Sequence, residues 1–108
     1  MVKLHYYKGV LAENLCMCYL WLRGHRIIGK RIKTPVGEID ILTRRRRTLY
    51  AIEVKYRSGG IDEAKMAVLK SRKRVQMAYK WWSQGKNTYQ VEFKYFVCSG
   101  FKVEVGSM

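Results

Sequence analysis

The chain has 108 residues, enough for one domain and too few for two. Lys and Arg total 22 against 8 Asp and Glu, which gives a formal net charge of +14. A compact domain with this excess repels itself unless a polyanion is near, so we expect nucleic acid as the partner, ahead of an anionic membrane surface. No apolar run reaches about 18 residues, which excludes a membrane span. Lys8, Glu13 and Asn14 interrupt the apolar stretch near the start, which argues against a secretory signal.

The chain has three cysteines, Cys16, Cys18 and Cys98. Their number is odd, and Cys16 and Cys18 are two residues apart in a helical pattern, so the two side chains point in different directions. This spacing suits neither a zinc site nor a redox pair. We therefore expect reduced core cysteines in a cytoplasmic protein.

The first predicted element is a helix from about Tyr6 to Leu22. Apolar residues recur at helical spacing along it, and Gly24 follows as a natural C-cap. The pattern predicts that the apolar stripe faces the core; its members are Leu11, Leu15, Cys18 and Leu22.

Three extended runs follow, at about 25–33, 36–43 and 49–55. In the second run, alternation predicts that Ile39 and Ile41 face one side of a sheet and that Asp40 faces the other, together with Glu38. The basic segment 44–47 separates the second run from the third and is expected to form a turn. The third run is nearly continuous in apolar character, which is typical of a central strand covered on both faces.

A second helix is expected from an N-cap at Asp62 to about Gln84, with Gly85 just past its end. Its predicted inward stripe is Ala64, Val68, Val75, Ala78 and Trp82. Alternation then predicts a strand at about 89–97, and a last edge strand at about 101–105. The order predicts a mixed α/β sandwich in which the first three strands form a meander and the second helix crosses over to the next strand.

The candidate chemistry lies in two neighbouring strands. Glu53 and Lys55 are two residues apart and project from one sheet face, where burial is costly unless they are paired or bind a cation. If the strands pair, Asp40 lies close to Glu53, and two adjacent carboxylates repel unless a divalent cation lies between them. Asp40 and Glu53 are therefore candidate ligands for Mg²⁺ (or Mn²⁺), with Lys55 orienting a water or stabilising charge on the phosphorane. Glu13 is a candidate for the outer shell or for a second metal. The alternative is a simple ion pair of Lys55 with the two carboxylates.

These motifs resemble a known family. Residues 37–42 (GEIDIL), a short turn and residues 52–57 (IEVKYR) look like the bacterial YraN family, and the first helix matches it in Gly9, Ala12 and Glu13. That family is grouped with the PD-(D/E)xK endonuclease-like fold, which includes Holliday junction resolvases and restriction enzymes. The resemblance implies a restriction-endonuclease-like three-layer sandwich with an αβββαβ core and a mixed central sheet, as one domain over residues 1–108. It also implies that Asp40 is the metal-binding aspartate, Glu53 the second acidic ligand, Lys55 the motif lysine and Glu13 the helix glutamate near the site.

The basic segments are expected to contact nucleic acid. They comprise Arg44, Arg45, Arg46 and Arg47 at the hairpin tip, and Lys70, Arg72, Lys73 and Arg74 on the outer faces of the second helix. No base-reading motif accompanies them. The favoured hypothesis is a Mg²⁺- or Mn²⁺-dependent endonuclease (a hydrolase) that acts as a homodimer on DNA, possibly branched or structured DNA. The alternatives are a non-catalytic nucleic-acid-binding module of the same fold, and a structural partner of a ribonucleoprotein or a membrane-surface protein.

Overall fold

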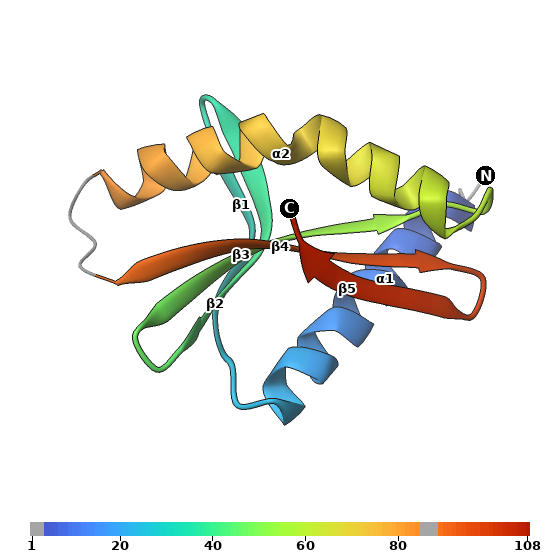
Figure 1. The fold of residues 1–108 in the computed structure, drawn as a ribbon, viewed down its shortest axis with the longest axis horizontal. Helices are drawn as coiled ribbons and strands as arrows, with labels where there is room; N and C mark the ends of the chain where they lie inside the picture. The colour runs from blue at the N-terminus through green and yellow to red at the C-terminus, as the bar shows by residue number, and fades with distance from the viewer. Residues whose placement is uncertain (1–3, 85–88) are drawn as a thin grey trace.

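A computed structural model describes residues 4–84 and 89–108 of the chain (Figure 1). The described residues form a mixed α/β fold of five strands and two helices. In chain order these are α1 (Leu4–Leu22), β1 (Arg26–Thr34), β2 (Gly37–Arg45), β3 (Thr48–Tyr56), α2 (Ile61–Ser83), β4 (Gln90–Ser99) and β5 (Lys102–Ser107). Gly85, predicted to lie just past the end of the second helix, is outside the described residues.

The strands form one sheet in the order β1-β2-β3-β4-β5. β1, β2 and β3 pair antiparallel as the predicted meander, while β3 and β4 pair parallel through the α2 crossover. β5 then pairs antiparallel with β4 along the edge of the sheet. The meander, the crossover and the central position of β3 are confirmed.

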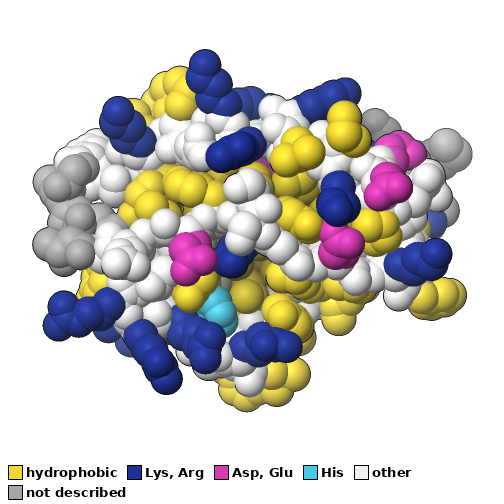
Figure 2. All heavy atoms as spheres, in the orientation of Figure 1, with side chains coloured by type: hydrophobic (Ala, Val, Ile, Leu, Met, Phe, Trp, Pro, Cys, Tyr) yellow, Lys and Arg dark blue, Asp and Glu magenta, His cyan; other side chains and the backbone are white. Residues whose placement is uncertain are grey.

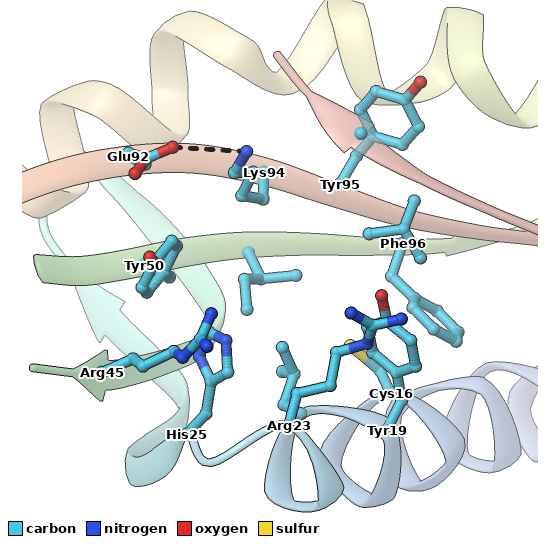
Figure 3. A pocket seen from close by; sticks show the side chains of 14 residues that line it. Cys16, Tyr19, Arg23, His25, Arg45, Tyr50, Glu92, Lys94, Tyr95 and Phe96 are labelled. Carbon is cyan, nitrogen blue, oxygen red and sulfur yellow. Dashed lines mark ion pairs between the residues drawn. The ribbon is translucent and has the colours of Figure 1, made fainter.

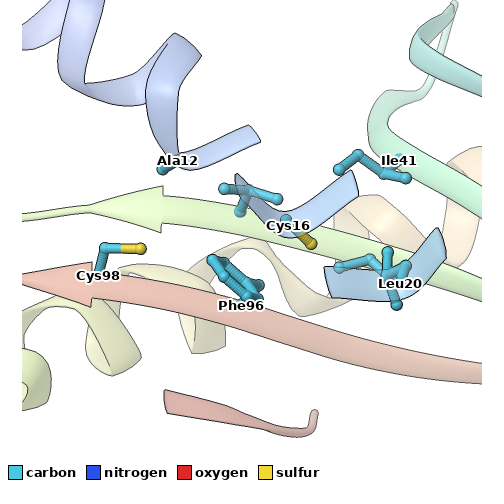
Figure 4. Close-up of a cluster of buried hydrophobic side chains, with 8 residues drawn as sticks. Ala12, Cys16, Leu20, Ile41, Phe96 and Cys98 are labelled. Carbon is cyan, nitrogen blue, oxygen red and sulfur yellow. The ribbon is translucent and has the colours of Figure 1, made fainter. Parts of the chain in front are cut away.

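Each face of the sheet is covered by one helix, so that the fold has three layers (Figure 1). On one face, α1 packs Ala12, Cys16 and Leu20 against a cluster that includes Ile52 and Phe96. Figure 4 shows these α1 side chains above β4. On the other face, α2 packs against a second cluster; its buried members are Ile39, Leu42, Leu49, Ala51, Val75, Ala78 and Tyr79.

The buried side of α1 differs from the predicted one. Ala12, Cys16 and Leu20 are 4%, 1% and 6% exposed, whereas Leu11 and Leu22 are 66% and 77% exposed. The rest of the predicted stripe is also exposed, including Cys18, so Cys18 is not a core residue. Small side chains at the first two buried positions allow the helix backbone to approach the sheet closely, and this packing outweighs the larger but more distant leucine stripe.

The alternation of β2 is interrupted at Asp40. Ile39 packs in the α2-side cluster and Ile41 in the α1-side cluster, so the prediction that both face one side was wrong. The β1–β2 register passes from the Ile32–Ile39 pair to the Lys30–Ile41 pair. Arg31, which lies between them, has φ of 51°, a left-handed conformation that is uncommon outside glycine. The chain therefore changes face at this point.

The second helix departs from prediction at its start, whereas its end at Ser83, with Gln84 as the C-cap, agrees with the predicted end at about Gln84. It begins at Ile61 after Gly60, and no side chain caps it, so Asp62 is a first-turn residue and not the cap. Tyr79 takes the core position predicted for Trp82, which is 36% exposed and packs beside the Tyr79 ring. Neither described helix combines the length and the apolarity that crossing a membrane requires.

Candidate functional site

A cavity of about 240 Å³ opens between β2, β3 and α2. It brings together Asp40, Glu53 and Lys55, the three residues on which the predicted site was centred. The whole lining consists of Glu38, Asp40, Glu53, Lys55, Ser71, Arg74 and Val75. Among these, Ser71 and Val75 were missed from the sequence, although with Arg74 they follow the i, i+3, i+4 spacing of one helix face.

The cavity lies where β2 and β3 separate. Their ladder runs from the Arg45–Thr48 pair to the Ile41–Ile52 pair, and the next pair in register does not form. Instead, the backbone N–H of Val54 donates to Asp40 Oδ2 at 2.8 Å. The carboxylate thus takes the place of a backbone carbonyl as acceptor. This hydrogen bond fixes the carboxylate beside Glu53, the residue that precedes Val54 in β3.

Glu53 is a buried carboxyl group, only 5% exposed. Burial raises its pKa most, and the hydrogen bond and negative charge of Asp40 raise it further, to about 8. The ammonium of Lys55, 3.6 Å from Glu53 Oε1, opposes this rise but does not cancel it. At neutral pH the pair therefore holds one proton that an isolated glutamate would have lost.

This donor set fits a divalent cation. A cation between Asp40 and Glu53 would replace the shared proton and relieve the repulsion that raises the pKa of Glu53. Over residues 4–84 and 89–108, no group of three or more His, Cys, Asp or Glu side chains is arranged to hold a metal. Two carboxylates with the remaining positions taken by water match Mg²⁺ better than zinc, which requires a fuller set of protein ligands.

Glu13 does not line this cavity. Its Oε1 accepts a hydrogen bond from Arg31 Nε at 3.0 Å, and the two charges form an ion pair. Burial, the neighbouring Cys98 and then the charges of Asp40 and Glu13 raise the pKa of the Cys16 thiol. Glu13, on α1, and Asp40, on β2, therefore both raise the pKa of the same buried thiol.

The basic residues divide into two regions. Arg74 lines the cavity, and Lys70, Arg72 and Lys73 are exposed near it on α2. The turn arginines lie at the hairpin tip, at the opposite end of the β2–β3 ladder from Asp40 and about 17 Å away at the usual rise per strand residue. Figure 2 shows Lys and Arg side chains over α2 and, separately, over the β2–β3 turn.

The model of one known protein family matches most of the chain. Residues 12–100 match the model of "Uncharacterised protein family UPF0102". The chain belongs to this family. Membership supports the YraN-like resemblance of the two strand motifs, and the matched range contains the entire carboxylate and lysine set.

Relatives from several bacteria carry the same family name. A UPF0102 protein of Parvibaculum lavamentivorans is 40% identical over 73 residues, 68% of this chain and 55% of the relative. One from Nitrobacter winogradskyi is 35% identical over 91 residues, which is 83% of this chain and 77% of the relative. One from Sphingopyxis alaskensis is 46% identical over 55 residues, 51% of this chain and 47% of the relative. The chain thus spans about half the length of some curated relatives, and their names state no activity.

Proposed function

We propose that this UPF0102 protein is a metal-dependent endonuclease that hydrolyses phosphodiester bonds in DNA. The observation that carries the proposal is the Asp40–Glu53 carboxylate pair beside Lys55, in a cavity open to a basic helix. A buried carboxyl group with a pKa near 8 is typical of functional sites, because a structural role alone rarely requires two adjacent carboxylates in a core.

In this proposal Asp40 and Glu53 hold Mg²⁺ or Mn²⁺. When bound, the cation polarises a phosphodiester oxygen and acidifies a water. The Val54 N–H keeps Asp40 oriented, and the ammonium of Lys55 holds the attacking water or stabilises charge on the phosphorane. Arg74, at the cavity wall, binds a neighbouring phosphate through its guanidinium.

The positive charges outside the cavity also support nucleic acid as the substrate. With a net charge of +14, the chain attracts a polyanion over distances longer than any single contact. The exposed cations of α2 continue from the cavity, so a strand bound along the helix passes the carboxylates. A homodimer supplies the two sites needed to cut both strands of a duplex or a branched substrate.

The second candidate is a non-catalytic nucleic-acid-binding module of the same fold. It is favoured by the Lys55–Glu53 ion pair and by the satisfied hydrogen bonding of the site. Every buried side-chain nitrogen or oxygen in the described residues has a partner without any added cation. In this case the set stabilises the fold, and DNA binding requires no metal.

The experiment is cleavage of supercoiled, linear, single-stranded, flapped and four-way DNA with Mg²⁺, Mn²⁺ or EDTA. The wild type is compared with Asp40→Asn and Lys55→Gln, which keep the shape of the cavity. We expect metal-dependent cutting that either substitution reduces at least 100-fold, with DNA affinity within about threefold, since both residues act in the transition state.

Asp62→Asn is the matched control because it removes an exposed carboxylate outside the cavity. Its cleavage rate should equal that of the wild type. A folded wild type that binds all five DNAs and cuts none would contradict the nuclease and support the binding module.

A further inference from the structure

A second cavity lies on the opposite, α1-covered face of the sheet. It has a volume of about 310 Å³ and opens between the last turn of α1 and strands β2 to β5. We name it the α1-side pocket; its lining includes Tyr19, Arg23, His25, Arg45, Tyr50 and Ile52. None of these residues lines the cavity that contains Asp40 and Glu53.

Two arginines from separate elements supply positive charge to the α1-side pocket. Figure 3 shows the guanidinium groups of Arg23, just after α1, and Arg45, in β2, both extending into its space. Arg23 lies over the Tyr19 ring, 4.8 Å from its centroid. Within residues 4–84 and 89–108, neither arginine forms an ion pair with a carboxylate.

The other charged groups of the pocket do not neutralise the arginines. Glu92 lies on β4 and pairs with Lys94 at 3.3 Å, so its charge is already balanced. The pKa of His25 is lowered first by burial and then by the positive charges of Arg45 and Arg23. The imidazole, which hydrogen-bonds the Thr43 hydroxyl at 2.8 Å, is thus held neutral in a region of unbalanced positive charge.

The rest of the lining is aromatic and apolar. Tyr50 packs against His25 with ring centroids 4.7 Å apart, and Tyr19 stands on the other side, beside Arg23. Ile52 and Leu20 contribute apolar surface to the lining. A ligand that fits must therefore combine a flat apolar body with a compact anionic group.

We infer that the α1-side pocket binds a single nucleotide, with its phosphate on Arg23 and Arg45 and its base against Tyr50. Planar guanidiniums match phosphate oxygens in pairs, and every base has a face that stacks on an aromatic ring. A volume of this size is at the lower end of the range for small-molecule sites, about 300 to 1,000 Å³, which suits one nucleotide and not a longer segment. The bound nucleotide is either a free 5′-mononucleotide or the 5′-phosphorylated end of a strand.

The test is calorimetric titration of the whole protein with 5′-AMP, adenosine or inorganic phosphate. EDTA is present throughout, so the result does not depend on the proposed nuclease site. We expect 5′-AMP to bind at least tenfold more tightly than either fragment. Arg45→Gln and Arg23→Gln should each weaken 5′-AMP binding about tenfold, because each removes a charge-assisted phosphate contact.

The matched control is Arg47→Gln, which removes the same charge from the turn that follows β2, at a residue that does not line the α1-side pocket. It should change the affinity for 5′-AMP less than twofold. An NMR titration gives a second readout, since a phosphate beside His25 should raise the imidazole pKa in the wild type and not in Arg45→Gln.

A 5′-phosphorylated oligonucleotide separates the two sources. If the 5′-phosphorylated oligonucleotide competes with 5′-AMP and the unphosphorylated strand does not, the pocket binds a strand end. If 5′-AMP binds and neither oligonucleotide competes, the pocket binds a free nucleotide. Equal loss of affinity in Arg45→Gln and Arg47→Gln, or 5′-AMP binding no tighter than phosphate, would overturn the inference and indicate diffuse charge attraction.

Discussion

The backbone N–H of Val54 donates a 2.8 Å hydrogen bond to the side chain of Asp40, at the point where β2 and β3 stop pairing through their backbones. A side-chain carboxylate in this position keeps the ladder donor satisfied while the strands separate. The separation leaves space between the strands and α2 for Glu53 and Lys55. The local irregularity of β2 is therefore what forms the cavity.

The raised pKa of Glu53 predicts a pH-dependent stability. Folding raises this pKa from 4.5 to about 8, so the folded chain binds a proton that the unfolded chain releases. The contribution of Glu53 is full below pH 4.5 and is lost as the pH rises toward 8, with a slope of at most about 1.4 kcal/mol per pH unit. Urea unfolding between pH 4 and 9 in EDTA measures this.

Glu53→Gln is the comparison, because glutamine imitates the protonated acid. The two proteins should have similar free energies of unfolding at low pH, and the variant should become increasingly the more stable as the pH rises. Parallel stability curves over the whole range would contradict the proton-sharing pair.

Because Gly37 lies very close to α2, adding one methyl group at this position should destabilise the fold. A Cβ at this position would lie 2.5 Å from the backbone carbonyl oxygen of Arg74, which cannot rotate away. Gly37→Ala should lower the free energy of unfolding by about 1 to 3 kcal/mol, since β2 or α2 must move. Gly9→Ala is the control: Gly9 lies in α1 with open space around it, so alanine should leave stability unchanged or raise it by about 0.5 to 1 kcal/mol. Equal losses in the two variants would show that the Arg74 contact is not limiting.

Much of this fold follows from local patterns. The period-two rule is enough to put Glu53 and Lys55 on one face of a strand, and the nearly continuous apolar character of residues 49–54 is enough to make β3 central. The long helix between β3 and β4 requires a crossover and hence a parallel pair. These features depend on each segment's own sequence, so they can be read before the fold is known.

Other features depend on contacts between segments and could not be read in this way. The rotation of α1 is decided by how closely Ala12 and Cys16 fit against the sheet, while periodicity alone favoured Leu11 and Leu15. The alternation of apolar and polar residues likewise does not predict that Arg31 takes a left-handed conformation opposite Asp40. The shift of Ile39 to the α2 side, and with it the shape of the candidate site, therefore emerges only in three dimensions.

The rotation of α1 predicts opposite results for two neighbouring leucines. Leu20 is 6% exposed and Leu22 is 77% exposed. Leu20→Ala should lower the free energy of unfolding by about 2 to 5 kcal/mol, and Leu22→Ala by less than about 0.5 kcal/mol. Chemical denaturation of both variants under the same conditions measures the difference. A larger loss for Leu22→Ala would contradict the buried face of α1 described above.

The lysines and arginines of α2 should contribute measurably to the affinity for DNA. Removing one lysine that contacts a phosphate should reduce the slope of log affinity against log salt by about 0.9. We expect this for Lys73→Gln, on the exposed side of α2, and no change for Lys102→Gln, an equal loss of charge on β5. Fluorescence anisotropy from 50 to 300 mM salt measures both slopes. The same reduction in the two variants would indicate that affinity follows net charge and not a surface on α2.

Mn²⁺ binding followed by electron paramagnetic resonance shows whether Asp40 and Glu53 together hold a divalent cation. We expect one saturable site in the wild type, tighter at pH 8 than at pH 6 because protons compete for Glu53. Asp40→Asn and Glu53→Gln should each abolish the site while remaining folded, and Asp62→Asn should retain it. Mn²⁺ binding that is absent from the folded wild type, or unchanged in Asp40→Asn and Glu53→Gln, would show that these two carboxylates do not hold a cation.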